Sequence, residues 1–171
     1  PDYGSVHDIV YTSLRDRAVV MNPTYRGQRR SDHSIQAKYP GLLTEGIGDA
    51  SSYVMRRVFV DVLRAVDVLY EQNLAQIGKM AVIGAGLGGS LALAVAARRG
   101  VVDAVAANTP MALGNPLAFE PGLAYPLAEF NDYLRMYPDQ RDAAAQSTAD
   151  LDPLNMASQI IAPVLLSVGI N

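Results

Sequence analysis

The chain has 171 residues, 50% of them hydrophobic, which suits one domain with a substantial core. The formal net charge is −3 and the basic residues are scattered, which excludes the basic surface of a nucleic-acid-binding protein. Cysteine is absent and His7 and His33 are the only histidines, so disulfides and a cysteine nucleophile are excluded and no metal site is expected. A chain without cysteine suits a reducing compartment, and we expect a cytoplasmic protein.

The N-terminal part of the chain is predicted to contain one strand, a long loop and one helix. Residues 18–22 form an apolar run that ends before a proline, which is typical of a buried strand. A polar, glycine-bearing stretch from 26 to 49 is expected to be a loop. Valines that recur at helical spacing predict a helix from about Tyr53 to Gln72. We expect Arg26 and Asp61 to brace the loop and this helix rather than to touch a substrate.

Buried strands and helices alternate through the rest of the chain. The predicted order is strand 79–83, glycine-rich turn 84–89, helix 90–99 capped by Gly100, strand 101–107, helix 127–136 and strand 163–169. This alternation predicts an α/β fold with a mostly parallel sheet flanked by helices, and we expect residues 1–171 to form a single domain. The uncharged stretch 80–97 is as long as a membrane helix, but its glycines divide it into a strand and a helix, so no membrane partner is expected.

The glycine-rich turn fits the pattern of a dinucleotide-binding site. Gly84, Gly86 and Gly89 satisfy G-x-G-x-x-G between a predicted strand and a predicted helix. Such a site needs an acidic residue at the end of the next strand, to bind the ribose hydroxyls. That place holds Ala106, Ala107 and Asn108, so the distal part of the pattern is missing.

The same turn also fits a nucleophile elbow, G-x-S-x-G, with Gly84 and Gly88 as the flanking glycines. The central position of an elbow carries the serine nucleophile, and here it is Gly86. Glycine adopts strained dihedral angles readily, so the turn is expected to persist without the hydroxyl. Ser90 is the nearest hydroxyl, but it lies one helical turn further on and is expected to be a packing residue.

An ordered series of motifs extends over nearly the whole chain. It comprises Arg26-Gly27-Gln28, Tyr53-Val54-Met55-Arg56, Phe59-Val60-Asp61-Val62-Leu63-Arg64-Ala65, Tyr133-Leu134-Arg135, Leu154-Asn155-Met156-Ala157 and Pro163-Val164-Leu165-Leu166-Ser167-Val168-Gly169. This series resembles the acetyl xylan esterase / cephalosporin-C deacetylase family. The resemblance implies an α/β-hydrolase fold, here partial, and removal of acetyl groups from sugars or similar esters through a Ser-His-Asp triad, without a cofactor.

The resemblance places three site positions in this chain. The nucleophile position falls on Gly86, so the serine is missing. The oxyanion-hole amide falls on Leu87, where the family usually has Gln, and Tyr3 matches the tail of the second oxyanion loop. The triad Asp would follow Asn171 and the triad His would lie further on. The resemblance therefore implies an esterase homologue that is catalytically impaired in this chain, acting on an acetylated sugar or a similar small ester.

Two other functions stay open. The fold could serve as a non-catalytic binding or assembly module, or the turn could bind a dinucleotide through Gly84, Gly86 and Gly89. The resemblance also implies a sheet in which a strand preceding Pro1 lies between residues 18–22 and the strand at 79–83. We therefore expect a homo-oligomer or a larger chain that supplies the missing strands.

Overall fold

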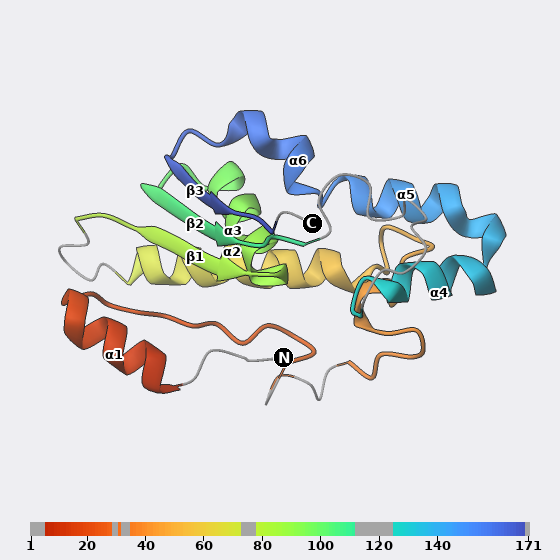
Figure 1. Ribbon diagram of the computed structural model, residues 1–171, viewed down its shortest axis with the longest axis horizontal. Coiled ribbons are helices and arrows are strands. Elements are labelled where there is room, and N and C mark those ends of the chain that lie inside the picture. Colours follow the sequence, from red (N-terminus) through yellow and green to blue (C-terminus); the bar gives the residue numbers. More distant parts are fainter. Residues whose placement is uncertain (1–5, 29–30, 32–34, 73–77, 112–124, 170–171) are drawn as a thin grey trace.

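The computed structural model describes residues 6–28, 31, 35–72, 78–111 and 125–169. Its sheet has three parallel strands in the order β1 (Ala81–Ala85), β2 (Ala104–Asn108) and β3 (Val164–Ser167). Figure 1 shows these strands side by side, with their carboxyl ends at one edge of the sheet. The predicted α/β fold with a parallel sheet flanked by helices is confirmed.

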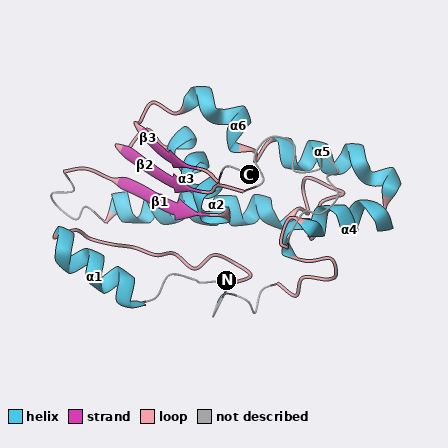
Figure 2. Ribbon diagram, in the orientation of Figure 1, coloured by secondary structure: helices cyan, strands magenta, loops and turns pink. Residues whose placement is uncertain are grey.

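Helices make up most of the remaining described structure (Figure 2). The α-helices are α1 (Val6–Asp16), α2 (Val54–Glu71), α3 (Leu87–Arg98), α4 (Ala128–Met136), α5 (Arg141–Ala149) and α6 (Pro153–Met156). The short 3₁₀ helices are η2 (Leu42–Thr44), η3 (Pro138–Gln140) and η4 (Ala157–Gln159). Helix α2 confirms the prediction from the valine spacing to within one residue at each end.

Helix α3 is the centre of the fold. Residues 89–96 of this helix are all buried, because α3 packs between the sheet and α2. Its alanines present small side chains, so the helix and the strands approach closely. A second apolar cluster around Ile47, Val58 and Phe130 joins the start of α2 to η2 and α4. The two clusters together hold the carboxyl edge of the sheet and the start of α3 in place.

One face of the sheet is exposed in the described structure, although the strands were predicted to be buried. Val82 and Val105 pack against the α3 cluster, whereas Ile83 is 76% exposed and Leu165 is 72% exposed. Ile83 aligns with Ala106, and Ala106 aligns with Leu165, so these side chains share the opposite face. The prediction of burial was wrong for this face, which the described helices α2 and α3 do not cover. It was also wrong for β3 as a whole, because all four of its residues are exposed.

The prediction of a strand at residues 18–22 is also wrong. These residues have no regular secondary structure and pair with no strand among the residues that the structure describes. A strand exists only through hydrogen bonds to a neighbour, and β1, at the edge of the sheet, pairs only with β2. The apolar run therefore predicted a strand where the described residues offer no neighbouring strand to pair with it.

Two further details differ from the sequence predictions. Helix α3 begins at Leu87 rather than at residue 90, and Arg99 is its C-cap in an extended conformation, so Gly100 is not the cap. The uncharged stretch 80–97 is divided between β1 and α3, as the glycines predicted. Within the described ranges, no helix has both the length and the apolar character needed to cross a membrane.

Candidate functional site

The strand-to-helix turn is concentrated in a single residue. Strand β1 ends at Ala85, Gly86 has φ 55° and ψ −123°, and α3 begins at the next residue. The amide of Gly86 donates to the carbonyl of Asn108 at the end of β2, at 3.0 Å. Its own carbonyl accepts from the amide of Ser90 at 3.2 Å and from that of Met111 at 3.3 Å. Gly86 therefore lies at the carboxyl edge of the sheet, tied to both β2 and α3.

The glycines of the turn have different physical roles. A Cβ atom on Gly84 would overlap the carbonyl oxygen of Gly88, so this position requires glycine. A Cβ atom on Gly89 would lie 3.2 Å from the carbonyl oxygen of Asn108, which is tighter than ordinary contact. A Cβ atom on Gly86 would meet no described atom within 4 Å. The positive φ favours glycine at 86, but the surrounding space admits a larger side chain.

Of the two predicted oxyanion-hole positions, Leu87 lies among the described residues and Tyr3 does not. Leu87 is the first residue of α3, and the first amides of a helix have no partner within that helix. Its amide follows the Gly86 corner directly, which is the position the elbow geometry requires. Tyr3 lies outside the described residues. Ser90 is 6% exposed and its hydroxyl donates to the carbonyl of Met111, which confirms it as a packing residue.

An apolar pocket of about 60 Å³ opens beside the start of α3. Leu87 and Ser90 line it together with residues of η2, α2, α4 and α5. The hydroxyl of Tyr53 in the pocket wall donates to the carbonyl of Leu43 at 2.9 Å, and that of Thr148 donates to the carbonyl of Ala144 at 3.1 Å. Burial, and then the charge of a nearby carboxylate, raise the pKa of Tyr53, so this phenol stays protonated. The pocket wall is therefore effectively apolar.

The carboxyl edge of the sheet carries polar residues beside the Gly86 corner. Asn108 aligns with Ala85 on one side and with Ser167 on the other. Thr109 follows Asn108 and has φ 41°, and its amide donates to the carbonyl of Ser167 at 2.6 Å. Both Asn108 and Thr109 are exposed. No sequence pattern predicted a role for Thr109, whose only local signal is its place before a proline at the end of a predicted strand.

The acidic residue needed for dinucleotide binding is not at the expected end of β2. Strand β2 ends in Asn108. Asp103 precedes the strand, and its carboxylate accepts a hydrogen bond from the amide of Met80 at 2.8 Å. It therefore lies at the amino edge of the sheet, away from Gly84, Gly86 and Gly89.

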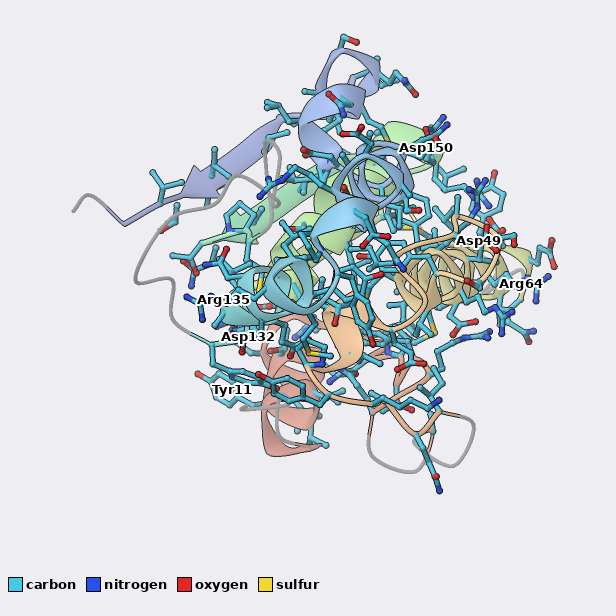
Figure 3. All side chains as sticks on the ribbon, turned by 90° about the vertical axis from the view of Figure 1, so that its right-hand side faces the viewer. Tyr11, Asp49, Arg64, Asp132, Arg135 and Asp150 are labelled. Carbon is cyan, nitrogen blue, oxygen red and sulfur yellow. The ribbon has the colours of Figure 1, made fainter. Side chains whose placement is uncertain are left out.

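The loop and helix brace expected from the sequence is present. The guanidinium of Arg26 donates two hydrogen bonds of 2.6 Å to the carboxylate of Asp61 in α2. These hydrogen bonds lower the pKa of Asp61 despite its partial burial. Charged side chains outside this pair, such as the labelled Asp49, Arg64 and Arg135, are exposed on different sides of the molecule (Figure 3). His33 lies outside the described residues, and the structure places His7 in α1.

A parallel sheet in which β1 enters α3 through one residue of positive φ defines a protein of the α/β-hydrolase type. The sequence profile of the family described as acetyl xylan esterase (AXE1) matches residues 2–171. The chain therefore belongs to the acetyl xylan esterase family.

Individual relatives agree with this assignment. The acetyl esterase Axe7A of Xylanibacter ruminicola is 30% identical over 152 residues, which cover 88% of this chain and 34% of that protein. The structure of an acetyl xylan esterase from Paenibacillus sp. R4 has a TM-score of 0.78 at 25% identity, over 95% of this chain and 54% of that one. Acetyl xylan esterase 1 from Thermoanaerobacterium sp. JW/SL YS485 has a TM-score of 0.71 at 20% identity, over 96% and 54% of the two chains, and shares the fold. The chain thus spans between one third and about half of the length of these relatives.

Proposed function

We propose that the protein carrying this chain is a carbohydrate-esterase homologue that binds acetylated sugar esters and is impaired in hydrolysing them. The observation that carries this proposal is the conformation of Gly86, which keeps the sharp turn of a nucleophile elbow but offers no oxygen. The names of the relatives, acetyl esterase and acetyl xylan esterase, support an acetylated, xylan-like ester as the ligand.

The chemistry explains why one missing atom matters. In ester hydrolysis by a Ser-His-Asp triad, the serine oxygen attacks the carbonyl carbon, the histidine takes its proton, and backbone amides stabilise the oxyanion. Removing a triad member leaves a residual acceleration of about 10³–10⁴-fold over water, supplied by binding and by the oxyanion hole. A site with Gly86 and the Leu87 amide retains the means to hold an ester, because binding does not need the hydroxyl.

The decisive experiment measures hydrolysis of p-nitrophenyl acetate by the complete polypeptide that contains residues 1–171. We expect the unmodified protein to be near the background rate and Gly86→Ser to gain at least about 10²-fold, since the space at residue 86 is open. Gly88→Ser is the matched control, because its added hydroxyl also meets open space but lies off the turn, and no gain is expected. Rapid hydrolysis by the unmodified protein, unchanged by substitutions in the turn, would refute the proposed impairment.

A binding module is the second candidate, and the open corner at Gly86 favours it specifically. An intact fold with an empty nucleophile position can bind an ester without consuming it. If binding is the function, acetylated xylo-oligosaccharides should raise the melting temperature of the complete polypeptide while no acetate is released. The same proposal includes a homo-oligomer or further strands that complete the sheet. Sedimentation of the complete polypeptide measures the oligomeric state.

A further inference from the structure

The segment after β2 is fixed at three points of its backbone. The carbonyl of Asn108 accepts from the amide of Gly86 at 3.0 Å, and the amide of Thr109 donates to the carbonyl of Ser167 at 2.6 Å. The amide of Met111 then donates back to the carbonyl of Gly86 at 3.3 Å. These hydrogen bonds attach the segment to the end of β3 on one side and to the elbow on the other. The conformation of Thr109 is therefore determined by its surroundings.

That conformation is unfavourable for threonine on three counts. The φ of Thr109 is 41°, in the left-handed region that side chains with a Cβ avoid. Threonine is β-branched, which makes a positive φ rarer still, and the next residue is Pro110, which restricts the residue before it to extended conformations. Among the described residues, Arg17 is the other non-glycine residue with a positive φ, and it follows the end of α1, where this conformation is ordinary.

The position of Thr109 gives this strain a functional meaning. Strand β2 is central, so Thr109 lies at the carboxyl edge between the Gly86 corner and the end of β3. Ligands of parallel α/β sheets bind beyond the carboxyl ends of the strands. Thr109 is exposed there, and its hydroxyl can both donate and accept a hydrogen bond. Strained residues held by their surroundings cluster at functional sites, whereas glycine or asparagine would fill a merely structural turn without strain.

We propose that Thr109 is a ligand-contacting residue, whose hydroxyl bonds a hydroxyl group of the sugar in the bound ester. This inference rests on the proposed function, because it takes the acetylated sugar as the ligand. It adds a contact that does not depend on the residue at position 86, and it therefore applies whether the bound ester is hydrolysed or only held.

The test uses the complete polypeptide and acetylated xylobiose, with binding measured by calorimetry. Thr109→Val keeps the β-branched shape without the hydroxyl and should weaken binding about 3- to 10-fold, while the melting temperature stays unchanged. Thr109→Ser keeps the hydroxyl and should retain the affinity. Thr109→Gly should raise the melting temperature, because the strain is relieved, and should weaken binding like valine. Arg17→Gly is the matched control, because it relieves a positive φ elsewhere and should leave binding unchanged.

The outcomes separate this inference from the function on which it rests. If the unmodified protein binds no acetylated sugar, the proposed function and the inference both fall. If it binds and Thr109→Val binds equally well, the proposed function stands and the role of Thr109 is refuted. If Thr109→Val and Thr109→Gly bind more weakly while Thr109→Ser keeps the affinity, the proposed function and the role of Thr109 are both supported.

Discussion

Gly84 in β1 and Gly88 in α3 lie on either side of the Gly86 corner, yet only one of them should tolerate a side chain. A methyl group on Gly84 would overlap the carbonyl oxygen of Gly88, whereas a methyl group on Gly88 would meet no described atom within 4 Å. Backbone atoms of β1 and α3 cannot move apart without breaking the packing of the central helix. We expect Gly84→Ala to destabilise the protein by about 2 kcal/mol or more, measured by urea unfolding.

Gly88→Ala serves as the control for this prediction. Residue 88 lies within α3, and alanine is a better helix former than glycine by about 1 kcal/mol, so this variant should be neutral or slightly more stable. Equal losses of stability for the two variants would show that the close approach of β1 and α3 at Gly84 is not what the structure indicates.

Glu129 is a buried titratable group that couples stability to pH in the acid range. It is 3% exposed, and its carboxylate accepts a hydrogen bond from the amide of Leu43 at 2.8 Å. Burial raises the pKa of this carboxyl above its ordinary value of 4.5, although the hydrogen bonds from Leu43 and Tyr125 act in the opposite direction. Between the ordinary and the raised pKa the folded state binds more protons than the unfolded state, so stability falls as pH rises through this window.

Glu129→Gln should therefore flatten the dependence of unfolding free energy on pH. The amide oxygen of glutamine can still accept from Leu43, but it does not titrate. The measurement is urea unfolding from about pH 4 to about pH 8, with Glu71→Gln at the exposed end of α2 as the control. If the unfolding free energy has the same slope against pH in the unmodified protein and in both variants, groups other than Glu129 cause the pH dependence.

At the scale of secondary-structure elements, the Arg26–Asp61 pair holds the loop before η2 against α2. Its two parallel hydrogen bonds of 2.6 Å and partial burial distinguish it from the Arg56–Asp150 pair, which lies at 3.8 Å with both side chains exposed. Asp61→Asn should cost about 1 kcal/mol, because solvent still screens the pair, and Asp150→Asn should cost nothing measurable.

The pH dependence of the Asp61 contribution has the opposite sign to that of Glu129. The pKa of Asp61 is lowered in the folded state, so its stabilisation is present above the ordinary pKa of 3.8 and is lost as pH falls through the folded value. The free energies of unfolding of Asp61→Asn and of the unmodified protein should therefore become equal in acid. A difference that persists unchanged in acid would mean that packing, not the charge pair, connects the two elements.

Sequence alone predicted those elements whose cause is local. Valine spacing predicted α2 nearly to the residue, and the glycines located the turn between β1 and α3. The observed strand bounds differ from the predicted ones where tertiary contacts determine them. Asp103 was predicted to lie in a strand, but its carboxylate accepts a hydrogen bond from the amide of Met80 and β2 begins after it. The φ of Thr109 results from hydrogen bonds to distant segments, which leave no pattern in the local sequence. For residues 18–22, the apolar run could not reveal whether a partner strand is present, so the predicted strand was wrong.

At the scale of the whole molecule, no described strand pairs with the outer edge of β1, and no described helix covers the sheet face that carries Ile83. The carbonyl of Met80 accepts a hydrogen bond from Ala104 in β2, and the amide of Gly86 donates one to Asn108 in β2. The alternate residues of β1 therefore direct their backbone groups away from β2. Ile83 stands at the centre of this edge and also on the exposed face. Natural proteins protect such edges, and this chain covers 54% of each of the two matched solved structures. We therefore expect further polypeptide to cover β1 and this face in the complete protein.

This expectation can be tested through the energetics of one side chain. If further polypeptide covers the face, Ile83→Lys in the complete polypeptide would bury an unpaired charge and should cost about 2 kcal/mol or more. Val68→Lys on α2, where the native side chain is 50% exposed, should stay within about 0.5 kcal/mol of the unmodified protein. Urea unfolding of both variants gives the comparison. A neutral Ile83→Lys would mean that residue 83 faces water in the complete protein as well, and that no further polypeptide covers this face of the sheet.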